Sequence, residues 1–135
     1  MRWGVLGSSS RIYAKSLNPG FAGAGHSVVA EARRSGDSLT PYEDLLGRSD
    51  VDAVYIPLPN DMHADWIHRA LDAGKHVLCE KPLTLSPQHT AEVFDHAEAA
   101  GRVLLEAYMW PHHPRARRLL ELASGGQLGT LQSGT

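Results

Sequence analysis

The chain has 135 residues, a formal net charge of −2 with neutral histidines, and 42% hydrophobic and 21% charged residues. These values are typical of one globular domain with its own core. The lack of a basic excess argues against nucleic-acid binding, and no apolar run approaches the roughly 18 residues that a membrane span needs. The single cysteine, Cys79, excludes an internal disulfide and, together with an N-terminus unlike a signal peptide, favours a cytoplasmic location.

Short β-rich runs alternate along the chain with longer segments of helical periodicity. Such alternation predicts βαβ units around a parallel sheet. The third run is apolar throughout, as a central strand covered on both faces should be. The five predicted strands are Trp3 to Leu6, Ser27 to Ala32, Ala53 to Ile56, His76 to Cys79 and Val103 to Glu106.

Prolines, glycines and capping residues mark the predicted helix boundaries. The sequence Thr40-Pro41-Tyr42-Glu43 has the form of a capping box with proline at the first helical position. Asn60 or Asp61 can cap the next helix, and Ser86-Pro87 can start the one after it. Pro114 opens a last predicted helix, which Gly125-Gly126 ends.

The first predicted strand leads into a turn of small residues, Gly7-Ser8-Ser9-Ser10-Arg11-Ile12. Small residues let backbone N–H groups approach a pyrophosphate, and serine hydroxyls can donate to its oxygens. The strict G-x-G-x-x-G is absent, because serines replace its second glycine. An ordinary strand-to-helix turn with serine caps explains the same residues.

Arg33-Arg34 follow the second predicted strand, where dinucleotide-binding proteins contact the adenosine ribose. An acidic residue there accepts a hydrogen bond from the 2′-hydroxyl, whereas arginine accommodates a 2′-phosphate. The two arginines predict NADP, with NAD as the alternative cofactor. A solvated basic corner without a ligand is the competing interpretation.

Two more loops follow predicted strands and are stiffened by proline. Pro57-Leu58-Pro59-Asn60 lies where a nicotinamide ribose would bind, with His63 in the next helical turn; Asn60 as a simple helix cap is the alternative. In Glu80-Lys81-Pro82, proline restricts Lys81 to extended geometry. A lysine fixed there can bind a substrate oxygen and shuttle its proton, although a surface pair with Glu80 is the usual fate of such neighbours.

The last candidate segment follows the fifth predicted strand and contains Tyr108, Trp110 and His113 between prolines. These side chains could line a substrate pocket or pack against a neighbouring domain or subunit. The histidine spacings do not match a zinc site, so no metal is predicted.

Taken together, four segments resemble the N-terminal half of the Gfo/Idh/MocA family of NAD(P)-dependent oxidoreductases. The resemblance implies an α/β fold with a doubly wound parallel Rossmann sheet in strand order 3-2-1-4-5 and helices on both faces. It also implies hydride transfer between nicotinamide and a sugar- or polyol-like alcohol or carbonyl. The matching segments are residues 2–7, 51–60, 73–82 and 101–110.

The resemblance assigns a role to each candidate residue. Lys81 matches the catalytic lysine, and Tyr108 and Trp110 match the segment leading into the substrate pocket, with His113 added on its chemistry. The expected cofactor-binding residues are Gly7, Ser8, Ser9, Ser10, Arg11, Ile12, Arg33, Arg34, Pro57, Leu58, Pro59, Asn60, His63, Glu80 and Lys81.

The chain departs from the family pattern in its phosphate turn, its short segment from Ala32 to Thr40, and its length. We expect a cofactor-binding domain at 1–123 and the start of a truncated C-terminal domain at 124–135. The expected partner is a small carbohydrate-like molecule, with neither nucleic acid nor membrane, and a homo-oligomer only if the C-terminal domain is present. The alternative function is a non-catalytic dinucleotide-binding module or a truncated gene product.

Overall fold

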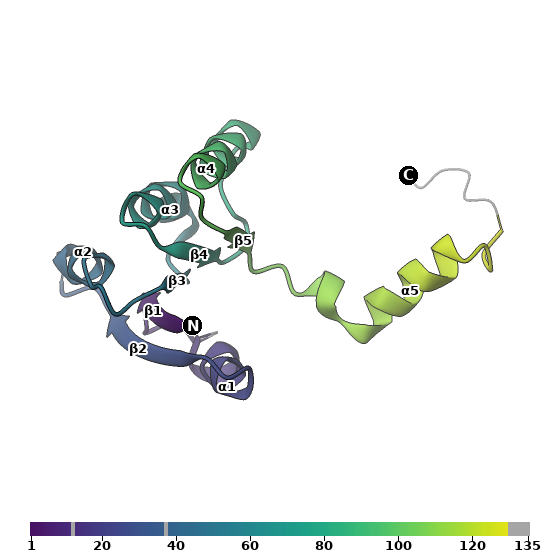
Figure 1. The fold of residues 1–135 in the computed structure, drawn as a ribbon, viewed down its shortest axis with the longest axis horizontal. Coiled ribbons are helices and arrows are strands. Elements are labelled where there is room, and N and C mark those ends of the chain that lie inside the picture. The colour runs from purple at the N-terminus through teal and green to yellow at the C-terminus, as the bar shows by residue number, and fades with distance from the viewer. Residues whose placement is uncertain (12, 37, 130–135) are drawn as a thin grey trace.

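The computed structural model describes residues 1–11, 13–36 and 38–129. These residues form a five-stranded sheet in which all neighbouring strands are parallel, with helices on both faces (Figure 1). The predicted α/β architecture is therefore confirmed. The strands are β1 (Arg2–Leu6), β2 (Ser27–Ala32), β3 (Ala53–Ile56), β4 (His76–Cys79) and β5 (Leu104–Glu106).

The predicted strand order was wrong, because the sheet runs β2-β1-β3-β4-β5. Only residues 33–39 separate β2 from α2 (Thr40–Leu46), which is too short for another helix and strand beyond β2. The chain instead crosses back through α2, and β3 pairs directly with β1. The order therefore reverses between β1 and β3, and in open α/β sheets such a reversal is where ligands bind.

The larger core lies under α2, α3 (His63–Asp72) and α4 (Pro87–Ala99), which cover one face of the sheet (Figure 1). Trp66 of α3 is 1% exposed and meets Tyr42 edge-on, with ring centroids 5.2 Å apart. The other fully buried members from the strands and helices include Leu6, Val54, Ile56, Ile67, Cys79 and Val93.

The opposite face is covered by a π-helical segment (Tyr13–Leu17) and α1 (Asn18–Gly23). Phe21 of α1 stacks on Trp3 with ring centroids 4.7 Å apart and packs with Tyr55 of β3. This cover does not reach the end of the sheet, because Leu105 of β5 remains 52% exposed.

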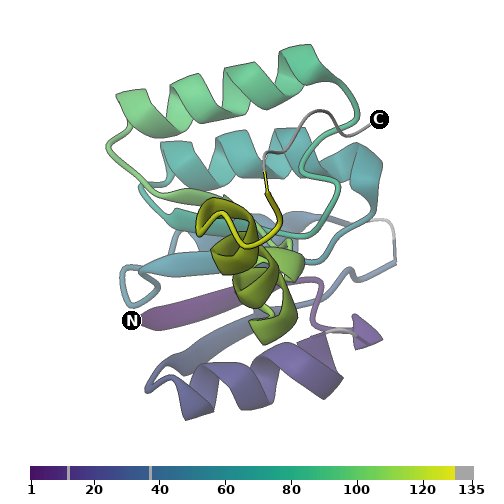
Figure 2. The ribbon, with the colours of Figure 1, turned by 90° about the vertical axis from the view of Figure 1, so that its right-hand side faces the viewer.

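Helix α5 (Pro114–Ser124) follows a 3₁₀ turn (Trp110–His112) and stands away from the sheet in Figure 1; Figure 2 views it in front of the sheet. Leu119 and Leu120 of this helix are 50% and 58% exposed. Among the described residues, no helix has the length and apolarity needed to cross a membrane.

The predicted caps are confirmed for α4 and wrong for two other helices. Ser86 Oγ accepts a hydrogen bond from His89 N at 3.1 Å. Thr40 lies inside α2, and its N–H donates to Ser38 Oγ at 3.3 Å, so no capping box forms. Asn60 and Asp61 fall within a 3₁₀ turn (Asn60–Met62) and precede the N-cap position of α3, which Met62 occupies without a side-chain cap.

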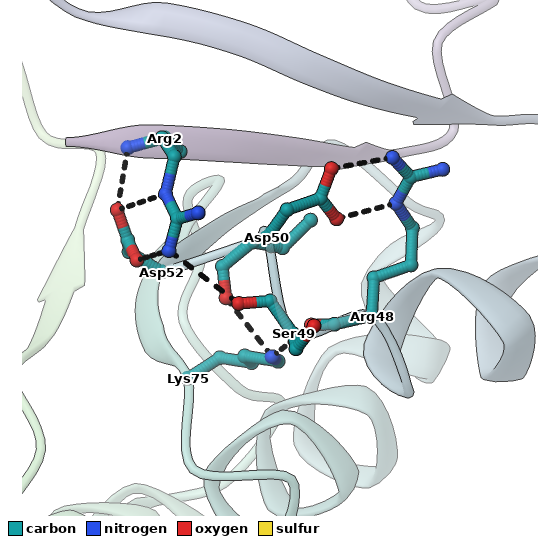
Figure 3. A network of polar contacts seen from close by, with 7 residues as sticks. Arg2, Arg48, Ser49, Asp50, Asp52 and Lys75 are labelled. Atoms are coloured by element: carbon teal, nitrogen blue, oxygen red, sulfur yellow. Dashed lines mark hydrogen bonds and ion pairs between the residues drawn. The ribbon is translucent and has the colours of Figure 1, made fainter.

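A polar network joins the amino-terminal ends of three strands (Figure 3). Arg2 Nη2 lies 2.6 Å from Asp52 Oδ1, which ties the start of β1 to the residue before β3. Lys75, just before β4, is 7% exposed and donates to the carbonyl oxygens of Arg48 at 2.6 Å and Val51 at 2.9 Å. Desolvation lowers the pKa of Lys75. Side chains thus connect the strands at their amino-terminal ends, opposite the carboxyl ends where the site is expected.

Candidate active site

A cleft of about 360 Å³ opens at the carboxyl ends of β1 and β3, where the strand order reverses. It brings together seven of the residues predicted from the sequence to bind a cofactor. These are Gly7, Ser9, Ser10, Arg34, Pro57, Leu58 and Pro59. Segments that follow three different strands therefore meet at one place.

Gly7 is required both by its backbone conformation and by the space around it. Its φ is +95°, and a Cβ there would lie 3.0 Å from Leu58 Cδ2 and 3.5 Å from Pro57 O. The N–H groups of Gly7 and Ser8 both donate to Ala32 O, at 2.8 and 3.0 Å. Because these two backbone donors are occupied, the hydroxyls of Ser9 and Ser10 are the better candidates for a phosphate.

The structure separates the two arginines that follow β2. Arg34 lines the cleft, whereas Arg33 lines a different groove of about 620 Å³ between β2 and α2, together with Asp44 and Arg48. Of the pair, only Arg34 is placed to contact a ligand in the cleft.

Glu31, the acidic residue near the end of β2, is engaged elsewhere. It accepts a hydrogen bond from Tyr13 Oη at 2.5 Å, on the face covered by α1. Burial and the neighbouring carboxylate raise the pKa of Tyr13, so this phenol remains a donor. The pair ties the segment after the phosphate turn to β2.

The turn that carries Lys81 follows β4, next to the loop that follows β3. Glu80 N donates to Ile56 O at 3.1 Å, and Lys81 itself is exposed. The Glu80 carboxylate is held from two sides, by Tyr55 Oη at 2.7 Å and by Lys81 N at 3.3 Å. Burial and the hydrogen bond to Glu80 raise the pKa of Tyr55. A neutral phenol therefore orients the carboxylate beside the lysine.

His63 is fully buried and lies behind the cleft, outside its lining. Its Nδ1 is 2.8 Å from Pro82 O and its Nε2 is 2.9 Å from Leu58 O. The other predicted cofactor-binding residues absent from the lining of the cleft are Ser8, Arg11, Arg33, Asn60, Glu80 and Lys81. The predicted contact of Ile12 lies outside the described residues.

The three predicted substrate residues are spread over separate features. Tyr108 lines an apolar hollow of about 210 Å³ with Leu78, Leu105 and Met109. Trp110 lies in the 3₁₀ turn and is 52% exposed. The Nδ1 of His113 accepts from Arg115 N at 3.1 Å and caps α5. These side chains do not form one pocket with Lys81 within the residues that the structure describes.

Two residues of the cleft, Tyr42 and Met62, were not predicted from the sequence. The sequence places Tyr42 only at the start of a helix, whereas in the structure this residue is 3% exposed and its ring packs edge-on against Trp66. The sequence feature that could have indicated Tyr42 is its position in the first predicted helix after Arg34, the residue expected near the adenosine ribose. For metals, the described residues contain no group of three or more His, Cys, Asp or Glu side chains able to hold an ion.

Residues 2–108 match the family model for Gfo/Idh/MocA proteins, described as an oxidoreductase family with an NAD-binding Rossmann fold. The chain belongs to the Gfo/Idh/MocA family. The match covers all five strands and the cleft, so the family assignment predicted from the sequence is confirmed.

Curated relatives of this family member include a dehydrogenase named for a sugar and a reductase named for a sugar nucleotide. A D-xylose 1-dehydrogenase (NADP(+)) from Haloferax volcanii is 45% identical over 148 aligned residues, covering 100% of this chain and 45% of the relative. A dTDP-3,4-didehydro-2,6-dideoxy-alpha-D-glucose 3-reductase from Streptomyces violaceoruber is 40% identical over 146 residues, covering 98% of this chain and 42% of the relative. The chain thus spans less than half the length of these relatives.

Solved structures of a ketoreductase are also similar to this chain in fold and sequence. A 3-ketoreductase from Actinomadura kijaniata in complex with NADP has a TM-score of 0.81 and 37% identity, covering 96% of this chain and 45% of that protein. The same ketoreductase with NADP and TDP-benzene has a TM-score of 0.81 and 38% identity, covering 93% of this chain and 42% of that one. The fold of this chain is therefore close to that of an enzyme crystallised with NADP.

Proposed function

We propose that this chain is the NADP-binding half of an oxidoreductase that acts on an alcohol or carbonyl carbon of a sugar-like molecule. The observation that carries the proposal is the cleft at the reversal of strand order, where the Gly7 turn, Arg34 and the Pro57–Pro59 loop meet. The cofactor-binding domain would comprise residues 1–123.

The donor set of the cleft fits a dinucleotide with a 2′-phosphate. The Ser9 and Ser10 hydroxyls would bind the pyrophosphate, and Arg34 would bind the 2′-phosphate, for which a guanidinium is well suited. Because Gly7 has no side chain, the phosphate turn can lie close against the Pro57 loop. The NADP named for several relatives supports this choice over NAD.

The chemistry requires a hydride, which a bound nicotinamide would supply, and a proton, which the chain must handle. Lys81, at the carboxyl end of β4, would donate the proton to a substrate oxygen in reduction and accept it in oxidation. Glu80, oriented by Tyr55, would keep a negative charge beside that lysine. The substrate would contact three residues predicted from the sequence, Tyr108, Trp110 and His113.

Arg34→Ala and its neighbour Arg33→Ala make a matched pair for testing the cofactor assignment. Fluorescence titration should show that Arg34→Ala weakens NADPH binding by about tenfold or more, the scale of a charge-assisted hydrogen bond, and leaves NADH binding nearly unchanged. Arg33→Ala, which changes the other groove, should bind both cofactors as the wild type does. Equal losses for NADPH and NADH in Arg34→Ala would reject the 2′-phosphate contact.

The second candidate function is a dinucleotide-binding module without catalysis. It is supported by the scattered positions of the predicted substrate residues among the described residues. Turnover assays with NADP and D-xylose, the sugar named for one relative, separate the two functions. Activity that disappears in Lys81→Met, with NADPH binding retained, supports the enzyme; tight NADPH binding without turnover supports the module. The single, buried Cys79 supports a cytoplasmic setting for either.

A further inference from the structure

Two loops at the cleft have few backbone N–H groups that could form hydrogen bonds between them. We call residues 57–59 the cleft loop and residues 80–82 the lysine turn. Pro57, Pro59 and Pro82 have no N–H to donate. The parallel ladder between β3 and β4 reaches as far as Glu80 N, which donates to Ile56 O at 3.1 Å. Beyond this bond, the spacing of the loops depends on side chains.

His63 supplies such a link. Its imidazole is 0% exposed and lies in the first turn of α3. Nε2 is 2.9 Å from Leu58 O in the cleft loop, and Nδ1 is 2.8 Å from Pro82 O in the lysine turn. Both partners are carbonyl oxygens, which only accept. A neutral imidazole can donate to one of them at a time and a protonated one to both.

We propose that His63 is a positioning residue that sets the spacing between the cleft loop and the lysine turn. Resting on the proposed function, this inference extends it to the nicotinamide end of the site, which would lie between the loops that follow β3 and β4. The adenosine end has two further parts, the Gly7 turn after β1 and Arg34 after β2, which share the cleft with residues 57–59. Loss of the imidazole should therefore weaken contacts at the nicotinamide end more than contacts at the adenosine end.

Two substitutions and one control separate positioning from general stability. His63→Phe keeps a ring of similar size and removes both nitrogens, whereas His63→Gln keeps an amide that can still donate to a carbonyl. His89→Phe makes the same chemical change at an exposed histidine of α4. The probes are NADPH and adenosine 2′,5′-bisphosphate, which carries the adenosine end without nicotinamide.

The loss of the buried hydrogen bond that the imidazole donates should weaken NADPH binding by about tenfold in His63→Phe. Binding of adenosine 2′,5′-bisphosphate should change by less than about twofold, because this probe makes no use of the lysine turn. His63→Gln should recover part of the NADPH affinity, and His89→Phe should match the wild type. Unchanged NADPH binding in His63→Phe, or equal weakening of both probes, would overturn the positioning role. A wild-type chain that binds no NADPH would instead refute the proposed function.

A spectroscopic readout keeps the proposal testable if His63→Phe does not fold. In protein labelled with ¹⁵N-histidine, the His63 ring N–H should exchange slowly with water because the ring is fully buried. NADPH, whose nicotinamide would lie between the two loops, should shift this resonance, and adenosine 2′,5′-bisphosphate should shift it less. If the chemical shift of this resonance does not change with NADPH, in a chain shown to bind NADPH, the inference is also overturned.

Discussion

Lys75→Met tests the polar network at the amino-terminal edge of the sheet. The Lys75 ammonium donates to the carbonyl oxygens of Arg48 at 2.6 Å and Val51 at 2.9 Å and is almost enclosed by protein. Methionine keeps most of the buried aliphatic length but leaves both acceptors without this donor. Each bond from a charged donor contributes roughly 1.5–3 kcal/mol. Desolvation of the ammonium opposes that gain.

The net cost of Lys75→Met should be about 2 kcal/mol in the free energy of unfolding at pH 7. For a domain of this length, that corresponds to a fall in Tm of roughly 8 °C. Urea unfolding followed by circular dichroism measures the first quantity, and calorimetry measures the second. Lys15→Met, at an exposed position in the π-helical segment, is the matched control and should change neither.

The pH dependence gives a second, independent check. Burial lowers the folded-state pKa of Lys75 below its ordinary value of 10.5, so the unfolded chain binds this proton more tightly. Stability rises with pH wherever the unfolded state holds more protons. The stability difference between wild type and Lys75→Met should therefore widen as pH rises from neutral toward 10.5. A Met variant as stable as the wild type, or a difference that narrows with pH, would refute this reasoning.

Three further substitutions test other parts of the chain. Gly7→Ala places a side chain at a φ of +95° and against Leu58, so the free energy of unfolding in urea should fall by about 1–3 kcal/mol. Fluorescence titration should also show weaker NADPH binding. Wild-type stability and affinity would mean that the turn can rearrange. Tyr55→Phe removes the donor to Glu80 and should lower the free energy of unfolding by about 1 kcal/mol, and a larger loss would point to repacking of the aromatic cluster. Leu105→Lys, at a side chain 52% exposed, should leave stability within about 0.5 kcal/mol of wild type and reduce any self-association in light scattering; strong destabilisation would show that this leucine is covered.

The elements of the fold were predictable because each is encoded locally. The apolar run Ala53 to Ile56 could only be a central strand, and Ser86-Pro87 carries both a capping side chain and a fixed φ. The strand order is not encoded locally. It depends on the length of the segment between Ala32 and Thr40, which is too short for the helix and strand that the expected order 3-2-1-4-5 requires.

The candidate site was predictable where it depends on backbone turns after strands, as at Gly7 and Arg34. It was not predictable where one side chain binds the backbone of a distant segment. The bonds of His63 to Leu58 and Pro82, for example, have no counterpart in residue spacing. The carbonyl partners of a histidine can be any residues, so their identity carries no signal.

The network around Lys75 and the cleft lie at opposite ends of the same strands. The four residues of β3 separate them by about 13 Å. Sequence changes in the loops beyond Leu6, Ile56 and Cys79 can therefore accumulate without touching the anchors that hold the strands in register. For protein engineering, this makes the chain a scaffold whose loops can be varied in libraries that change specificity, provided that Gly7 is kept in its turn and Arg2, Asp52 and Lys75 stay in place.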